Sequence, residues 1–393
     1  MQQVNDLFKK AIQALVDKHE THQAARISSN QIVLRDYRNN PSSSFQLAFE
    51  RMCGEYEQLG MIEVKRIKGS AGIQSISLKD YHKAIELLNH TPLKAQIKKA
   101  LSAFVLNFTK PLSEDVERCA EYAQFQWTNK QKFLGCSVGE SKKLATIVKA
   151  AIGVIAQKHK YDSIDYRHFS ATHLDHSKHL SEIKGKVVEA VKLLEAENIK
   201  GLSSEDFLAA YGVVQLNHPV YLSGEIYLLS DNRRLDAGFD GGVGVWPVHV
   251  NQIEMIAPIS TITTIENQAT YEKYLFNRKA DEVVLFTSGI PSPGFKRLYR
   301  MIVAACQTAI VKHWGDIDIG GFTILNMLEF SIKKSVKAFN MEPSKYSKNY
   351  GSFSKSEVEH LKKIKVSKIN EEVLDLAINC EKKFEQESFK WID

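Results

Sequence analysis

The stretch HWGDIDIGGFTIL, residues 313–325, follows the apolar run TAIV and places two aspartates beside two glycines. Asp316 and Asp318 are two residues apart, so both carboxylates of an extended chain would point to the same face. Carboxylates that share a face repel each other and raise each other's pKa, which favours a cation between them. A hard divalent ion, Mg²⁺ or Mn²⁺, is the expected ligand because such ions bind one or two carboxylates and keep water or phosphate as their other ligands.

The residues around this stretch predict where the two carboxylates lie. Gly320 and Gly321 are expected to form a tight turn and to let a large ligand approach the backbone. β-type and helical patterns alternate from residue 220 onward, which is typical of an α/β domain whose mostly parallel sheet is covered by helices. Ligands of such sheets bind at the carboxyl ends of the strands. Glu266 ends another β-type run and precedes a helix for which Asn267 is a possible cap, so it is the expected third carboxylate.

The first ninety residues predict a winged helix. A helix over about 4–19 and a second one with aromatic residues at helical spacing precede a hairpin centred on 69–72. In this fold the second helix and the hairpin commonly contact DNA. The candidate phosphate-binding residues are on or beside the hairpin: Lys65, Arg66 and Lys68. A solvated edge hairpin or a surface for protein contacts is the alternative interpretation.

Residues 82–225 carry mainly helical patterns, interrupted by the polar stretch YRHFSATHLDHSKHL. His173, His176 and His179 are spaced three apart beside Asp175, which could suggest a metal site. Zinc is not favoured from the sequence, because a convincing site needs a thiolate or a defined fourth ligand.

Composition sets broader limits. The chain has 393 residues, a net charge of +6 and a pI near 8.8, which predicts two to four domains and permits a nucleic-acid partner. Five scattered cysteines indicate neither a disulfide framework nor a zinc knuckle. No apolar run reaches the roughly 20 residues of a membrane span, so we expect no membrane association and a cytoplasmic location.

Several motifs together resemble a known family. The segments TIEN, TSGIPSPGFKRL, HWGDIDIGGFTIL and KKFEQES are similar to the JetD nuclease subunits of Wadjet anti-plasmid systems, which are relatives of the topoisomerase VI A subunit with a Toprim domain. The segment DHSKHL matches a Ser-Lys pair of that family at Ser177 and Lys178. An acidic residue expected just before the pair is replaced by His176, which leaves the role of this segment open.

The resemblance implies a multidomain α/β architecture. A winged helix is expected over 1–90, a helical arm over 91–135, a central winged-helix region like that of catabolite activator protein over 136–218, and a Toprim domain with a helical C-terminus over 219–393. The implied activity is Mg²⁺-dependent endonucleolytic hydrolysis of circular double-stranded DNA by a homodimer, with a condensin-like SMC–kleisin motor complex as partner. Glu266, Asp316 and Asp318 would be the catalytic and metal-binding residues.

Two alternatives to hydrolysis remain open. One is cleavage through a covalent tyrosyl intermediate, as in topoisomerase VI, although neither Tyr161 nor Tyr166 stands in a matching motif. The other is a non-catalytic winged-helix protein that binds DNA or assembles a complex.

A lysine-rich region over 331–370 is a further candidate DNA grip, with interleaved aromatic residues Tyr346, Tyr350 and Phe353. Its lysines that lie nearest in sequence to the acidic site are Lys333, Lys334 and Lys337. A charge run is also typical of a merely solvated face.

Overall fold

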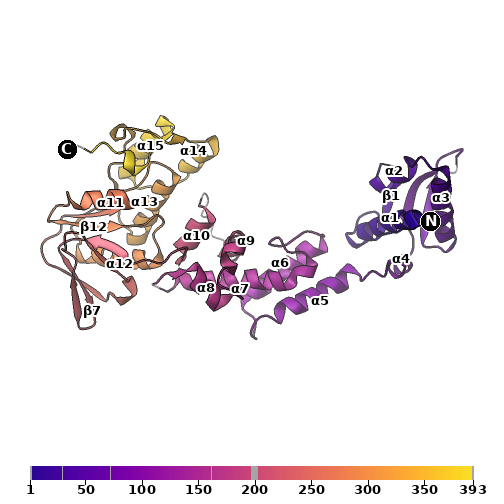
Figure 1. Cartoon of the computed structure of the whole chain (residues 1–393), viewed down its shortest axis with the longest axis horizontal. Helices are drawn as coiled ribbons and strands as arrows, with labels where there is room; N and C mark the ends of the chain where they lie inside the picture. The colour runs from indigo at the N-terminus through magenta and orange to yellow at the C-terminus, as the bar shows by residue number, and fades with distance from the viewer. Residues whose placement is uncertain (1, 29, 71, 161, 196–201, 392–393) are drawn as a thin grey trace. The chain divides into compact units, whose positions relative to one another are not determined.

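The computed structural model describes residues 2–28, 30–70, 72–160, 162–195 and 202–391, and divides the chain into two compact units, 1–146 and 147–393. The protein is a mixed α/β protein, about half helical, with several sheets (Figure 1). Helix α7 (Ser141–Lys158) contains the boundary between the units. Within the described residues, no helix is both long and apolar enough to cross a lipid bilayer.

The first unit begins with helices packed on a small antiparallel sheet of strand order β1-β3-β2. Helix α1 buries one stripe, including Phe8 and Ile12, against this sheet and against helix α3, as its 3.6-residue apolar period predicts. The elements are α1 (Gln2–Glu20), β1 (Arg26–Ser28), α2 (Ile32–Arg38), α3 (Ser43–Gln58), β2 (Ile62–Arg66) and β3 (Ile73–Leu78). The helices and the hairpin predicted for this region are confirmed.

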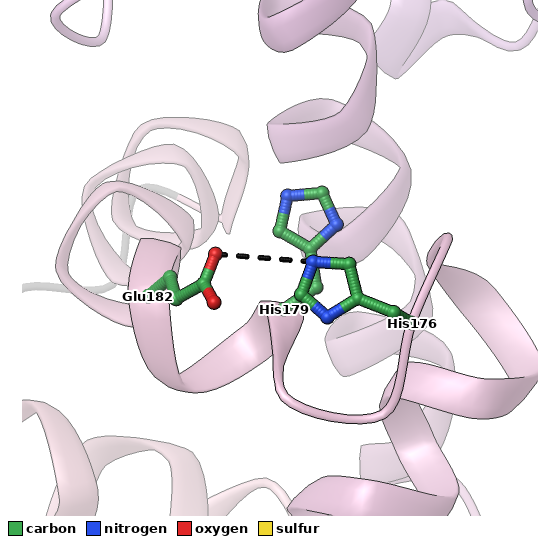
Figure 2. A group of neighbouring side chains, drawn as sticks. All are labelled: His176, His179 and Glu182. Atoms are coloured by element: carbon green, nitrogen blue, oxygen red, sulfur yellow. Dashed lines mark ion pairs between the residues drawn. The ribbon is translucent and has the colours of Figure 1, made fainter.

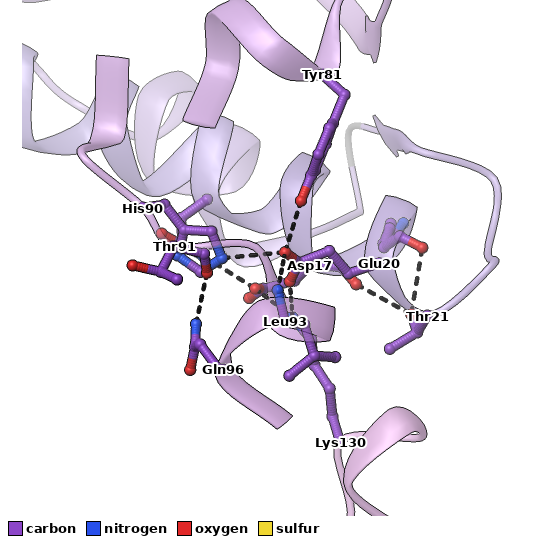
Figure 3. Close-up of polar contacts among 11 residues, drawn as sticks. Asp17, Glu20, Thr21, Tyr81, His90, Thr91, Leu93, Gln96 and Lys130 are labelled. Atoms are coloured by element: carbon purple, nitrogen blue, oxygen red, sulfur yellow. Dashed lines mark hydrogen bonds and ion pairs between the residues drawn. The ribbon is translucent and has the colours of Figure 1, made fainter. Parts of the chain in front are cut away.

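Three helices continue this unit: α4 (Tyr81–Leu88), α5 (Leu93–Val105) and α6 (Glu114–Thr128). Glu20, at the end of α1, joins them (Figure 3). Its side chain is 5% exposed and accepts hydrogen bonds from Tyr81 Oη at 2.8 Å, the Leu93 amide at 2.9 Å and His90 Nε2 at 3.1 Å. Lys130 Nζ lies 3.3 Å from its other oxygen. One buried carboxylate therefore ties α1 to the start of α5 and to the residues after α6.

The second unit begins with a helical segment. After α7 come β4 (Ile164–Asp165), α8 (Tyr166–His173), α9 (His179–Glu195), α10 (Ser204–Ala210) and β5 (Val213–Val214). Strands β4 and β5 pair in parallel, and α8 and α10 both pack against α9. No antiparallel wing hairpin occurs in the described part of 136–218.

A six-stranded mixed sheet of order β14-β13-β11-β12-β6-β9 forms the centre of the C-terminal part. β11 to β14 are parallel to one another, while β6 and β9 pair antiparallel, so the predicted mostly parallel sheet is confirmed. The strands are β6 (Val220–Ser223), β9 (Val243–Val245), β11 (Thr261–Ile265), β12 (Glu282–Phe286), β13 (Ile310–Trp314) and β14 (Lys337–Ala338).

Three helices connect the parallel strands: α11 (Gln268–Leu275), α12 (Pro293–Ala305) and α13 (Ile319–Ile332). The predicted alternation of strands and helices is confirmed, and Asn267 caps α11 by accepting from the Thr270 amide at 3.0 Å. Helix α13 ends at Ile332, because the chain leaves it at Lys333 in a left-handed conformation with φ of 53°.

Smaller elements complete the unit. β7 (Ile226–Ser230), β8 (Arg233–Asp236) and β10 (Gln252–Met255) form a separate antiparallel sheet. β15 (Gly351–Ser352), α14 (Lys355–Leu361), α15 (Glu371–Cys380) and β16 (Lys382–Lys383) follow the main sheet, and β15 pairs with β16.

Candidate metal-binding site

The strand order places a crevice between the ends of β11 and β13. The connection after β11 leads to β12 on one side, and the connection after β13 leads to β14 on the other side. Such a reversal between neighbouring parallel strands opens a binding crevice at their carboxyl ends. Ile265 and Trp314 are register partners at the last positions of the two strands, so Glu266 and the aspartates leave the sheet at this crevice.

Glu266 and Asp316 meet in this crevice. The Glu266 amide donates to the Trp314 carbonyl at 3.0 Å, and the Asp316 amide donates to Glu266 Oε2 at 3.1 Å. Burial raises the pKa of Glu266 to about 8, and the charges of Asp316 and Asp318 add to this shift. Burial likewise raises the pKa of Asp316 to about 7. Carboxyl groups with pKa values raised this far into the neutral range keep part of their protons there, and a bound cation would replace those protons.

Asp318 is placed differently from the expectation. Strand β13 ends at Trp314, so Asp316 and Asp318 lie in the following loop and do not share a strand face. Asp318 caps α13, with Oδ1 accepting from the Gly321 amide at 2.9 Å, and its Oδ2 accepts from Tyr350 Oη at 2.8 Å. Among the described residues, the three carboxylates do not form a set with one oxygen each within 4.8 Å of one another. Glu266 and Asp316 are thus the pair that the structure brings together directly.

The predicted glycine turn is instead the first turn of α13, which begins at Ile319. Gly321 is required there because a Cβ at this position would lie 2.0 Å from the Asp316 carbonyl oxygen. A Cβ on Gly320 would meet only Asp318 Oδ1, at 3.1 Å. The physical reason for Gly321 is therefore the close approach of the Asp316 backbone, not a positive φ.

Gln386 holds the ends of both strands, and sequence reasoning did not single it out. Its amide donates to Asp316 Oδ1 at 2.8 Å, and its side chain accepts from the Asn267 amide and donates to the Trp314 carbonyl, both at 2.7 Å. The residue is fully buried. It fixes the positions from which Glu266 and Asp316 emerge.

Two further acids flank Gln386. Glu385 and Glu387 are exposed, and their charges add to the raised pKa of Asp316. Glu387 also accepts from Asn267 Nδ2 at 2.7 Å. The segment KKFEQES therefore contributes negative charge to the crevice, a role that only its spatial proximity reveals.

His313 lies on the strand just before the acidic loop and is completely buried. Its Nδ1 lies 2.9 Å from Thr264 Oγ1, while Nε2 has no hydrogen-bond partner in the described structure. Burial lowers the pKa of His313 to about 3, so the ring is neutral at physiological pH. It supplies no positive charge to the carboxylates.

The basic candidates occupy several places. Lys65, Arg66 and Lys68 are exposed on or beside the β2–β3 hairpin, and Arg66 pairs with Glu57 at 3.1 Å. Ser177 and Lys178 are exposed in the turn between α8 and α9.

The lysines after α13 lie at the other end of the sheet from the acidic crevice. Lys334 Nζ donates to the carbonyls of Gln307 and Ala309, which precede β13, at 3.2 and 3.0 Å. Helix α13 has 14 residues and spans about 20 Å, so it carries the chain back from the crevice. Closeness in sequence therefore does not place Lys333 and Lys334 beside the carboxylates. Lys337 is exposed on β14.

The interleaved aromatic residues belong mainly to the core. Tyr346 and Phe353 are buried, and Tyr346 Oη accepts from Trp314 Nε1 at 3.1 Å. Tyr350 is 46% exposed and reaches the crevice through Asp318. Burial and the Asp318 charge raise the pKa of Tyr350, so its phenol stays protonated.

Of the two tyrosines considered as nucleophiles, the structure describes only Tyr166. Tyr166 begins α8, is 6% exposed, and burial raises its pKa to about 12. A buried phenol of this pKa is a poor nucleophile. Tyr161 lies outside the described residues.

The C-terminal part of the chain is similar to known proteins. Residues 224–392 match the family described as "Wadjet protein JetD, C-terminal". A Wadjet protein JetD of Bacillus cereus (strain Q1) is 23% identical over 148 residues, which are 37% of this chain and 36% of that relative. The matched stretch thus spans about a third of the relative's length. The resemblance drawn from the motifs is confirmed for this region.

Proposed function

We propose that this chain, whose C-terminal part matches the JetD family of Wadjet proteins, is a divalent-metal-dependent DNA endonuclease. The observation that carries the proposal is the meeting of Glu266 and Asp316 at the crevice between two parallel strands, with the pKa values of both carboxyls raised well into the neutral range. A structural ion pair would lower these pKa values, whereas an acidic cluster that holds a metal raises them when the cation is absent.

The donor set fits Mg²⁺ or Mn²⁺. Carboxylate oxygens are the ligands that these hard ions prefer, and one or two carboxylates with water and substrate phosphate suffice. Glu266 and Asp316 would hold the ion, and Asp318 would join them by giving up its bond to Tyr350. When bound, such an ion polarises a phosphodiester and helps to generate the attacking hydroxide. We propose that this arrangement is a Toprim-type metal site, as the motifs imply.

The chain's own residues would orient the reaction. Gln386 and the Asp316 amide keep the two carboxylates in place, and Gly321 lets the loop pack tightly behind them. Glu266 could instead exchange a proton with the attacking water or the leaving 3′ oxygen, in place of binding the ion. Tyr350, as a protonated phenol, can donate to a phosphate oxygen.

Hydrolysis is preferred over a tyrosyl intermediate. Tyr166 is buried with a raised pKa, and the phenol at the crevice, Tyr350, is held protonated by its acidic neighbour. Neither is prepared for nucleophilic attack. A non-catalytic assembly role would leave unexplained why two acids, Glu266 and Asp316, are held at a crevice with raised pKa values.

We also propose the DNA contact, the substrate, the partner complex and the oligomeric state. The N-terminal elements have the order of a winged helix, and we propose that their hairpin contacts double-stranded DNA. Following the family, the substrate would be circular DNA presented in the cytoplasm by a condensin-like SMC–kleisin complex, and the active form a homodimer, since a double-strand break needs two centres or two passes. The divisions predicted at 90, 135 and 218 remain part of this proposal.

The hairpin contact has its own test. Replacing Lys65, Arg66 and Lys68 by glutamate should weaken DNA binding and reduce the slope of its salt dependence by up to about 0.9 for each phosphate that the variant no longer neutralises. An unchanged slope in a DNA-binding titration would remove the hairpin from the proposal.

Cleavage is tested by incubating the full chain, alone and with its neighbouring Wadjet subunits, with circular and linear plasmid and Mg²⁺ or Mn²⁺. Glu266→Gln and Asp316→Asn should abolish cleavage and keep DNA binding, while Glu272→Gln, on the exposed face of α11, should cleave normally. A protein-linked DNA end after denaturation would establish the tyrosyl route. Full cleavage by both carboxylate variants would refute the proposed site.

A further inference from the structure

We propose a second metal site, formed by His176, His179 and Glu182 at the junction of α8 and α9, that binds a Zn²⁺-class ion (Figure 2). One ligand atom of each residue lies within 4.8 Å of the others, which no other three His, Cys, Asp or Glu side chains achieve in the described part of the chain. Two imidazoles and one carboxylate suit Zn²⁺ and related borderline ions, whereas Mg²⁺ prefers oxygen ligands alone. The site is independent of the proposed nuclease centre.

One edge of the cluster, between His176 and Glu182, is close to the spacing that a bound ion requires. His176 Nε2 lies 3.9 Å from Glu182 Oε2. Zinc–ligand bonds of roughly 2.0–2.1 Å place tetrahedral ligand atoms about 3.3 Å apart, so the ligands must close by less than an ångström at this edge. The side chains of His176 and Glu182 are 53% and 60% exposed, so neither is held by packing.

One rearrangement is needed. The rings of His176 and His179 are stacked, with centroids 4.7 Å apart and planes at 1° to each other. The lone pair of an imidazole nitrogen lies in the ring plane, so two parallel rings cannot aim at one ion. The more exposed ring, His176, must therefore turn, and Figure 2 shows it beside the Glu182 carboxylate, with their ion pair drawn as a dashed line.

Asp175 lies on the Nδ1 side of His179, which leaves Nε2 as the nitrogen that would bind the ion. Its side chain is 19% exposed, and the buried Nδ1 has no hydrogen-bond partner in the described structure. A buried polar atom without a partner is unfavourable. Asp175 Oδ2 is 3.9 Å from this nitrogen, in position to orient the ring while the other nitrogen binds a metal.

The turn that carries the ligands is fixed by backbone bonds. The fully buried Ser170 accepts from the Leu180 amide through Oγ at 3.1 Å and from the Leu174 amide through its carbonyl at 2.8 Å. The His179 amide donates to the His176 carbonyl at 3.0 Å. A turn that is already ordered loses little conformational entropy on binding an ion.

The structure changes the histidine set suggested by the sequence. His173 packs against Phe169, with ring centroids 4.7 Å apart, and is not part of the cluster. Glu182, three residues after His179 on the first turn of α9, takes its place. The turn that carries the ligands also contains Ser177 and Lys178.

The test uses the full-length protein. Co²⁺ should produce the visible absorption of a tetrahedral site, and Zn²⁺ should displace it at one equivalent. Zn²⁺ binding is then measured by calorimetric titration in excess Mg²⁺, which occupies sites made of oxygen ligands alone. His176→Ala, His179→Ala and Glu182→Gln should each weaken Zn²⁺ binding by at least about tenfold, as removal of a ligand or of its orienting partner does.

The matched control is His168→Ala, which removes an exposed imidazole from the neighbouring helix α8 and should bind Zn²⁺ like the parent. Glu182→Gln alters an exposed side chain, so it reports on the site even if a histidine variant folds poorly. Absence of Co²⁺ absorption, or Zn²⁺ binding that is unchanged in Glu182→Gln and His176→Ala, would overturn the proposal and leave the cluster as a stacked histidine pair.

Discussion

Replacing Gln386 by alanine should destabilise the second unit and stop cleavage. The variant keeps the amide that donates to Asp316 but loses both side-chain bonds, which leaves the Asn267 amide without a partner and the Trp314 carbonyl with only the Glu266 amide. A buried group left unpaired costs about 1–3 kcal/mol and a lost hydrogen bond about 0.5–1.5 kcal/mol, so the substitution costs roughly 3 kcal/mol. For a unit of this size, that lowers the melting temperature by about 6–12 °C.

Thermal denaturation without metal measures the stability, and plasmid cleavage below the melting temperature measures the activity. Gln386→Glu keeps the side-chain length but faces an oxygen towards the Trp314 carbonyl and adds charge beside Asp316, so it should be the least stable variant, and Mg²⁺ should recover part of its stability. Gln268→Ala, on the exposed surface of α11, should change the free energy of unfolding by less than about 0.5 kcal/mol. A Gln386→Ala protein that melts and cleaves like the parent would refute the role of this residue.

Three further outcomes follow from the described contacts. Gly321→Ala should abolish cleavage and lower the free energy of unfolding by several kcal/mol, of the order seen for overpacking, because its Cβ would collide with the Asp316 carbonyl. In urea denaturation, Gly320→Ala should unfold nearly as the parent does. The pKa of Glu20 is lowered, since its hydrogen bonds outweigh the effect of burial. The parent should therefore lose stability as acidification below pH 4.5, the ordinary pKa of a glutamate, protonates this carboxylate. Glu20→Gln should lack that loss in thermal melts recorded over a range of pH. Glu266 has a raised pKa, so the metal-free parent should lose stability as the pH rises from about 4.5 to 8, and Glu266→Gln should flatten this dependence; an identical pH profile would contradict it.

Local sequence patterns predicted most helices and strands of the described residues and the position of the crevice. Apolar runs ending in Glu266 and before Asp316 predicted two strands, and parallel strands must present their carboxyl ends together. The cap at Asn267 and the early hairpin are local in the same sense.

The sequence did not predict contacts between residues far apart along the chain. Gln386 reaches Asp316 across 70 residues, and nothing in the segment KKFEQES indicates which of its side chains points into the crevice. The expectation that Asp316 and Asp318 share a strand face assumed that β13 continues, whereas it ends at Trp314 and Asp318 starts a helix. Lys334 is near the acidic loop in sequence but not in space, because α13 carries the chain to the other end of the sheet.

The bond between Gln386 and the strand ends has a consequence for how the protein is made. Chains grow from the N-terminus, so a nascent chain holds Glu266, Asp316 and Asp318 long before residue 386 has left the ribosome. Until then, nothing fastens Asn267 and Trp314 to each other through Gln386. A partly synthesised copy would therefore carry the three acids without the bonds through which Gln386 holds the ends of β11 and β13.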